Sequence, residues 1–281
     1  MVAAPLLATI AAALALAAAI QRRAFFTLRF APTRHTWAAL AAGLLPAAFS
    51  TLALLFPQGS LPYNFVLWVL IFGLCGFAIP WAYVLLVERG TLAGLGIHGR
   101  RWKLSLLLSL LFAAGSLVPV LQRADLAKYE TSHLLGAVIH LNVGGLFELF
   151  LYYGFLHLRL RDAFGALPAI MGSAAIYSLW HIGTELPLHP DPAAALGMLF
   201  VVGLLCHALF ATTYNLLVIW PCFFTAGVMN DFILNLDLPE VIGRDLAWPA
   251  FGWLLAAVVP GAIWAHARGL RAATRGGRAH V

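Results

Sequence analysis

Residues 61–87 read LPYNFVLWVLIFGLCGFAIPWAYVLLV and contain no Asp, Glu, Lys, Arg or His. A helix of about 20 apolar residues crosses a hydrocarbon core of about 30 Å. The apolar residues of this run are continuous rather than alternating, which excludes a strand of a membrane barrel. The run therefore predicts a transmembrane helix.

The rest of the chain has a similar composition. Of 281 residues, 62% are hydrophobic and 10% are Asp, Glu, Lys or Arg, whereas a soluble domain has about 45–50% apolar and about 25% charged residues. This composition excludes a nucleic-acid-binding protein, a disordered chain and a disulfide scaffold, and all three cysteines lie in apolar runs. We predict an all-α polytopic membrane protein, a bundle of about eight or nine transmembrane helices.

Nine stretches are long and apolar enough to span a membrane. They are residues 3–20, 36–56, 61–87, 104–121, 133–158, 167–187, 193–213, 215–236 and 247–266. Because basic residues follow the first stretch instead of preceding it, we expect a retained helix rather than a cleaved signal peptide.

The basic residues alternate between the two sides of the predicted bundle. Three of the 17 lie on one side, and the other fourteen follow the first, third, fifth and ninth stretches. These fourteen are Arg22, Arg23, Arg29, Arg34, Arg89, Arg100, Arg101, Lys103, Arg159, Arg161, Arg268, Arg271, Arg275 and Arg278. The positive-inside rule then predicts an external N-terminus and a cytoplasmic C-terminus. The same arginines would attract anionic lipid headgroups.

Two ionisable residues inside the predicted spans are the main candidates for a site, since such residues are costly in a bilayer. Glu148 lies about ten residues, hence about 15 Å of helix, from the basic end of its span. His181 lies on the next, antiparallel span, with Tyr177 and Glu185 on its helix face. We predict that Glu148 and His181 form a proton-handling couple. The alternative is structural, with a protonated Glu148 and a histidine each hydrogen-bonded in the core.

Other polar residues in the spans are weaker candidates. We expect His133 at the membrane interface, His140 near the same cavity as Glu148, and His207 in a structural hydrogen bond. Asn230 and Asp231 lie at the end of an apolar run, where a role at a helix end and a role in a site are both open.

The sequence FELFLYYGFLHLRLRDAFGALPAIMGSAAIYSLWHIGTELP, residues 147–187, resembles the CPBP family of intramembrane proteases. This family includes the CAAX prenyl endopeptidases and the bacteriocin-processing, Abi-like enzymes. Its motifs are Glu-Glu-x-x-x-Arg, Phe-x-x-x-His and His-x-x-x-Asn or Asp. The resemblance covers about residues 130–235 and implies that Glu148 activates water with His181 as its partner. It also implies a membrane-anchored peptide or protein substrate and a bacterial inner-membrane location.

The motif match is partial. Leu149 replaces the second glutamate and Tyr153 replaces the arginine, so both members of one ion pair are lost together, which is tolerated better than losing one. Tyr177 replaces the phenylalanine. In the third motif, Thr225 or Ala226 stands at the histidine, and Met229 or Asn230 at the asparagine. The side chains that could assist the reaction are Tyr152, Tyr153, Asn230 and His207.

Three hypotheses about function follow. The first is an endopeptidase of this family with altered site chemistry. The second is a catalytically silent relative that binds a stoichiometric partner membrane protein. The third is a haem- or metal-binding subunit, although His181 with Glu185 is the only local metal-like pair and the resemblance implies no cofactor. In all three we expect a single domain, composed of helices 1–4 (1–125), the core (130–235) and the last helix with a basic tail (247–281).

Overall fold

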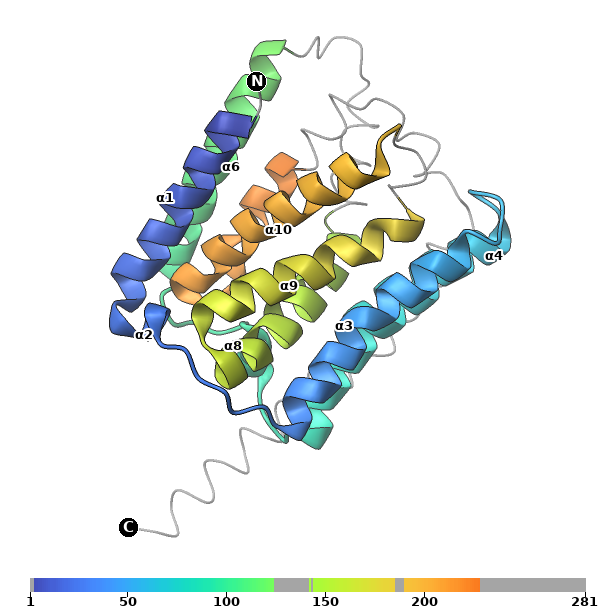
Figure 1. The fold of residues 1–281 in the computed structure, drawn as a ribbon, viewed down its shortest axis with the longest axis horizontal. Helices are drawn as coiled ribbons and strands as arrows, with labels where there is room; N and C mark the ends of the chain where they lie inside the picture. The colour runs from blue at the N-terminus through green and yellow to red at the C-terminus, as the bar shows by residue number, and fades with distance from the viewer. Residues whose placement is uncertain (1–2, 124–141, 143, 185–189, 228–281) are drawn as a thin grey trace.

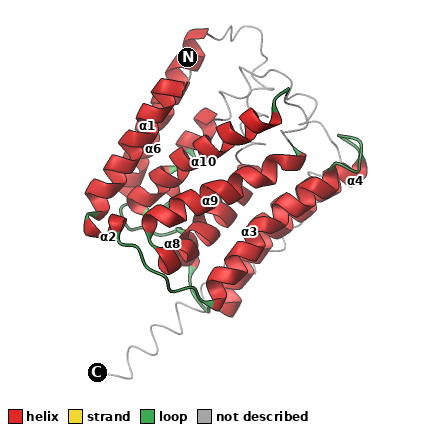
Figure 2. Ribbon diagram, viewed as in Figure 1, coloured by secondary structure: helices red, strands yellow, loops and turns green. Residues whose placement is uncertain are grey.

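The computed structural model describes residues 3–123, 142, 144–184 and 190–227. These residues form helices joined by short loops and contain no strand, as Figure 2 shows. The predicted all-α class is therefore confirmed.

The helices follow the apolar stretches closely. The N-terminal ones are α1 (Ala3–Gln21), α2 (Arg23–Phe26), α3 (Arg34–Ala53), α4 (Leu61–Asn64), η1 (Phe65–Ala78), α5 (Ile79–Ala82), η2 (Tyr83–Val87), η3 (Leu92–Leu95) and α6 (Trp102–Arg123). The later ones are η5 (Leu149–His157), α8 (Leu158–Phe164), α9 (Ala166–Trp180), η6 (His181–Gly183), α10 (Pro192–Thr213) and η8 (Leu216–Val218). The elements from α4 to η2 follow one another without a break and form one long helical run.

Three of the described helices are long and apolar enough to cross a membrane. They are Arg34–Ala53, Leu61–Val87 and Pro192–Thr213. This number is lower than the predicted nine, because other stretches form shorter helices or lie partly outside the described residues. The ninth stretch, 247–266, lies wholly outside them. The result agrees with an integral membrane protein with an all-α fold.

The fifth predicted span ends later than expected. Residues 144–148, η5 and α8 form one continuous helix that ends at Phe164, whereas the sequence predicted an end near residue 158. Arg159 was expected in a loop but lies inside this helix, and 7% of it is exposed. Its charge is tolerated there because Glu88 neutralises it, as described below.

The helices α1, α10, α9 and α3 lie side by side in this order in Figure 1, and η5 with α8 packs behind α9. Every residue of η5 is buried. A helix that is apolar on all sides is stable only inside a protein or a bilayer, so η5 is the central helix of the bundle. The residue before this helix segment is Glu148, which places the candidate site in the core.

Short turns and a close helix contact fix the two helices that carry the candidate site. Gly165 joins α8 to α9 with φ +99°, and a Cβ there would lie 2.2 Å from the carbonyl oxygen of Thr27. Only glycine fits such a position. Gly183, two residues after His181, approaches Ser50 of α3 so closely that a Cβ would lie 1.7 Å from its carbonyl oxygen.

Candidate active site

Glu148 directly precedes η5, and the aromatic residue before it is fixed by two ring contacts. Glu148 is 9% exposed. The preceding Phe147 stacks on Phe72 of η1, with ring centroids 4.7 Å apart, and meets Trp180 of α9 edge-on at 4.9 Å. These contacts fix the backbone that carries the carboxylate. Because little of Glu148 is exposed to solvent, the electrostatic interactions of its carboxylate are stronger than they would be in water.

His181 lies where α9 ends and the 3-10 turn η6 begins, and it is 2% exposed. Its Nδ1 lies 3.3 Å from the carbonyl oxygen of Tyr177. A carbonyl oxygen can only accept, so Nδ1 carries the proton and donates it, which leaves the Nε2 lone pair for other contacts. The ring is held by Trp180, at 4.1 Å between centroids, and by Tyr177 at 5.0 Å.

The Nε2 atom of His181 lies 3.9 Å from Oε1 of Glu148. The structure thus brings together the two side chains that the sequence singled out, across two consecutive helices. The distance is longer than a direct hydrogen bond and short enough for strong electrostatic coupling. With one proton between them, the two groups are either both neutral or a balanced ion pair, and such a couple can pass a proton.

The two tyrosines after Glu148 face different helices. Tyr152 is fully buried, its ring meets Tyr177 edge-on at 5.6 Å, and its hydroxyl has no hydrogen-bond partner among the described residues. Tyr153 forms a hydrogen bond with Cys206 of α10 and lies 4.3 Å, ring to ring, from His207. Tyr152 is therefore the better placed of the two to donate a hydrogen bond within the site.

His207 does not join Glu148 and His181. Its Nδ1 lies 3.1 Å from Nδ1 of His157, and the two rings stack at 5.1 Å. Both residues are fully buried. One Nδ1 must donate and the other accept, so the pair links η5 to α10 by a hydrogen bond. The structural role predicted for His207 agrees with this contact, whereas His157 was missed by the sequence analysis.

The third motif is described only in part. Thr225, at one of the two positions where the family has histidine, exchanges hydrogen bonds with Asn142, whose Nδ2 lies 3.1 Å from Thr225 Oγ1. Ala226 is buried and offers no polar group. Asn142 was also missed, since an asparagine six residues before Glu148 carries no signal of its own. The other candidates lie outside the described residues; they are His133, His140, Glu185, Met229, Asn230 and Asp231.

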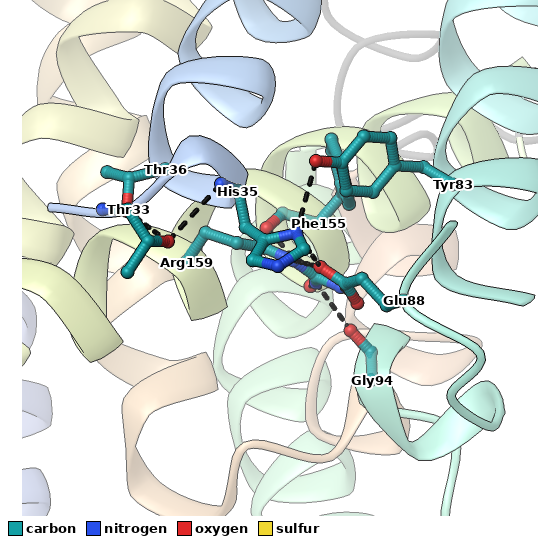
Figure 3. A network of polar contacts seen from close by, with 9 residues as sticks. Thr33, His35, Thr36, Tyr83, Glu88, Gly94, Phe155 and Arg159 are labelled. Atoms are coloured by element: carbon teal, nitrogen blue, oxygen red, sulfur yellow. Dashed lines mark hydrogen bonds and ion pairs between the residues drawn. The ribbon is translucent and has the colours of Figure 1, made fainter. Parts of the chain in front are cut away.

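A second polar cluster, the Arg159 cluster, consists of Arg159, Glu88, His35 and Tyr83 (Figure 3). The Arg159 guanidinium donates two hydrogen bonds to the Glu88 carboxylate, one of them Nε to Oε1 at 3.1 Å. His35 Nδ1 lies 3.1 Å from the Tyr83 hydroxyl and 3.6 Å from Glu88 Oε1. The cluster borders a cavity of about 530 Å³ that Glu148 and His181 do not line.

Carbonyl groups satisfy the rest of the Arg159 guanidinium. Its Nη1 donates to the carbonyl oxygens of Gly94, at 2.6 Å, Gly154 and Phe155. Its central carbon also lies 4.5 Å from the Phe155 ring centroid, in a cation–π contact. Among the described residues, no group of three His, Cys, Asp or Glu side chains lies close enough to hold a metal ion.

A buried glutamate and a histidine on consecutive helices of an all-α bundle are the arrangement that the resemblance to the CPBP-type intramembrane proteases implies. The comparison with protein families names the relation more closely: residues 130–231 match the family described as Type II CAAX prenyl endopeptidase Rce1-like. This confirms the resemblance, and the matched segment contains Glu148, His181 and His207. No curated protein and no solved structure matches the chain.

Proposed function

We propose that this protein is an intramembrane endopeptidase that hydrolyses membrane-anchored peptides or proteins, with Glu148 as the general base and His181 as its partner. The observation that carries the proposal is the 3.9 Å approach of the two side chains within the matched segment. Both are buried, and each is positioned by its own helix.

The proposed reaction uses one water molecule. The Glu148 carboxylate removes a proton from this water, whose oxygen attacks the scissile carbonyl carbon to form a tetrahedral oxyanion. The C–N bond then breaks, and the proton passes to the leaving amine. The Nε2 lone pair of His181 can take this proton from Glu148, which gives a balanced pair of imidazolium and carboxylate until the proton is passed on. Hydrolysis therefore needs no oxidant, reductant or cofactor.

The oxyanion needs a hydrogen-bond donor, and Tyr152 is our choice for it. Its hydroxyl is buried, lies one helical turn beyond Glu148, and has no partner among the described residues. A buried donor without a ground-state partner keeps its hydrogen for the transition state. The replacements at Leu149 and Tyr153 do not oppose this function, since Leu149 is packed in the core and the Tyr153 hydroxyl bonds to Cys206.

The orientation in the membrane also belongs to the proposal, with the N-terminus outside and the basic end in the cytoplasm. Segments rich in arginine converge there: the Arg29 amide donates to the carbonyl oxygen of Phe164, and its guanidinium donates to that of Arg161. Single cysteines at Arg23 and Arg89 should be labelled by a membrane-impermeant thiol reagent only after the membrane is opened. Labelling of these cysteines in intact cells would instead show that the basic end faces outward.

The deciding experiment compares two Glu→Gln variants. Purified wild-type protein, Glu148→Gln and Glu88→Gln are incubated in lipid vesicles with a fluorogenic prenylated peptide. We expect Glu148→Gln to lose about 10³-fold in kcat/KM with unchanged stability, since a general base contributes about 10²–10⁴-fold. Glu88→Gln should instead lower stability and leave the rate of the folded fraction unchanged.

Equal activity of Glu148→Gln and wild type would refute Glu148 as the base. Wild-type protein and Glu148→Gln also test the hypothesis of a catalytically silent relative that binds a partner membrane protein. The replaced motif residues favour this hypothesis. If neither protein changes the termini of any membrane protein in cells, and both co-purify with one stoichiometric membrane partner, the protein binds rather than cleaves.

A further inference from the structure

A second cavity, of about 330 Å³, lies at the basic end of the bundle. Four segments that are distant in the sequence meet around it: the end of α1, the loop before α6, α8, and the end of α10. The side chains that matter for its chemistry are Gln21, His98, Arg100, Arg101, Arg161 and Tyr214. We call it the arginine cavity. None of the residues that line it is acidic.

Two of the three arginines are fixed in place by neighbouring groups. Arg101 donates from Nη1 to the carbonyl oxygen of Thr212 at 3.3 Å. The Arg161 guanidinium carbon lies 4.4 Å from the Tyr214 ring centroid, and Nε and Nη2 donate to Asp162. Asp162 lies outside the arginine cavity and uses only part of the hydrogen-bonding capacity of Arg161, because a guanidinium has five N–H groups.

Hydrogen bonds from two side chains to carbonyl groups fix the backbone around the cavity. Asn215 Nδ2 donates to the carbonyl oxygens of His98, at 2.7 Å, and Arg100, at 3.0 Å. His98 Nε2 donates to the carbonyl oxygen of Tyr214 at 3.0 Å. Arg101 and Tyr214 both adopt left-handed backbone conformations, with φ of 56° and 53°. Such conformations are strained for residues other than glycine and persist only where the surroundings impose them.

We propose that the arginine cavity binds a phosphate group, carried by an anionic phospholipid or as free phosphate. Guanidinium groups match phosphate oxygens with paired hydrogen bonds. The volume lies at the lower end of the range of about 300–1,000 Å³ for ligand pockets, which suits a headgroup better than a peptide. This site is separate from Glu148 and His181 and does not depend on the proposed protease activity.

The surface next to the cavity favours the phospholipid as the source. Arg101 directly precedes α6, and three apolar side chains on one face of α6 are exposed: Leu107 (54%), Leu111 (60%) and Val118 (51%). A phosphate held by Arg100 and Arg101 would place acyl chains along this apolar surface. Lipid chains contribute to binding through each buried methylene.

The test measures lipid retention by native mass spectrometry of the purified full chain in detergent. The probes are phosphatidylglycerol, phosphatidylcholine and inorganic phosphate. The variants are Arg100→Gln/Arg101→Gln and, as a control with the same charge loss, Arg23→Gln/Arg89→Gln, whose positions line neither cavity. A third variant, Asp162→Asn, frees the Arg161 guanidinium.

We expect phosphatidylglycerol to bind at least about tenfold more tightly than phosphatidylcholine. The Arg100/Arg101 variant should weaken this binding about 30-fold, since each arginine contributes about 1 kcal/mol to such contacts. The Arg23/Arg89 control should change it less than about threefold, and Asp162→Asn should strengthen it. Displacement of the lipid by millimolar inorganic phosphate supports a free-phosphate ligand, and retention of the lipid supports the headgroup.

Two outcomes would overturn the proposal. One is equal retention of the two lipids together with no binding of inorganic phosphate. The other is an equal loss in both double variants, because diffuse surface charge would then explain the binding without the cavity.

Discussion

Among the residues that the structure describes, two carboxylate groups are mostly removed from solvent, and their partners differ. Glu88 faces the guanidinium of Arg159 through two hydrogen bonds, whereas Glu148 faces the imidazole of His181 at 3.9 Å. The exposed fraction of the side chain is 20% for Glu88 and 11% for Glu148. Glu148, the more buried of the two, therefore faces a histidine, which can be neutral, whereas Glu88 faces an arginine, which is always charged.

This difference separates a structural pair from a reactive one. Arginine stays protonated at every accessible pH, so Arg159 cannot exchange a proton with its partner and acts only as a fixed charge. Histidine exists in both protonation states, so Glu148 can give and take a proton while the pair stays balanced. We therefore assign stability to the Arg159 cluster and proton transfer to Glu148 with His181.

The largest effect on stability should come from Arg159→Met. Removing the cation takes the main partner from the half-buried Glu88 carboxylate and leaves three carbonyl groups without the guanidinium donor. Breaking such a pair costs about 3–5 kcal/mol of unfolding free energy. Unfolding by SDS in mixed micelles measures the loss. The double variant Glu88→Leu/Arg159→Met should recover most of it, and a loss below about 1 kcal/mol in the single variant would show that the pair is not structural.

The second effect, on catalysis, should come from His181→Asn. An amide can keep the hydrogen bond to Tyr177 but cannot take up a proton, so kcat/KM should fall about 10²-fold. The midpoint of SDS unfolding should change little. If activity falls only in proportion to the folded fraction, His181 supports the fold and not the reaction.

Part of this comparison could be predicted from the sequence. Glu148 and His181 stand out because each is an ionisable residue in a long apolar run, and the short turn at Gly165 makes the two helices neighbours. The membrane class followed from composition alone. These features depend on periodicity and on one turn, and both are local.

The Arg159 cluster and His157 could not be predicted in this way. Arg159 and Glu88 are 71 residues apart, and each lies beside other charged residues that are typical of a loop. His157 lies nine residues after Glu148, about two and a half turns of an α-helix, which puts it on the opposite face. In the structure, Leu149–His157 is a π-helix with hydrogen bonds from i to i+5, so the spacing of side chains changes. No pattern in a single sequence signals that change.

The next smaller effect should come from Gly183→Ala, which tests how firmly His181 must be held. The new Cβ would lie 1.7 Å from the Ser50 carbonyl oxygen, so η6 and α3 must separate. Overpacking of this kind costs about 1–3 kcal/mol, and it should move His181 away from Glu148 and lower activity further than stability. Gly197→Ala is the matched control, since nothing lies within 4 Å of its Cβ position in α10. Equal effects of both variants would show that the contact with Ser50 is unimportant.

The smallest effect should come from His35→Asn, the counterpart of His181→Asn in the Arg159 cluster. His35 also faces a glutamate, at 3.6 Å, but its side chain is 31% exposed and Glu88 already has the arginine as its main partner. Partly exposed contacts of this kind contribute less than about 1 kcal/mol. We expect a stability loss below that value and unchanged kcat/KM in the vesicle assay. A loss of activity comparable to that of His181→Asn would contradict the assignment, because it would mean that the histidine outside the matched segment takes part in the reaction.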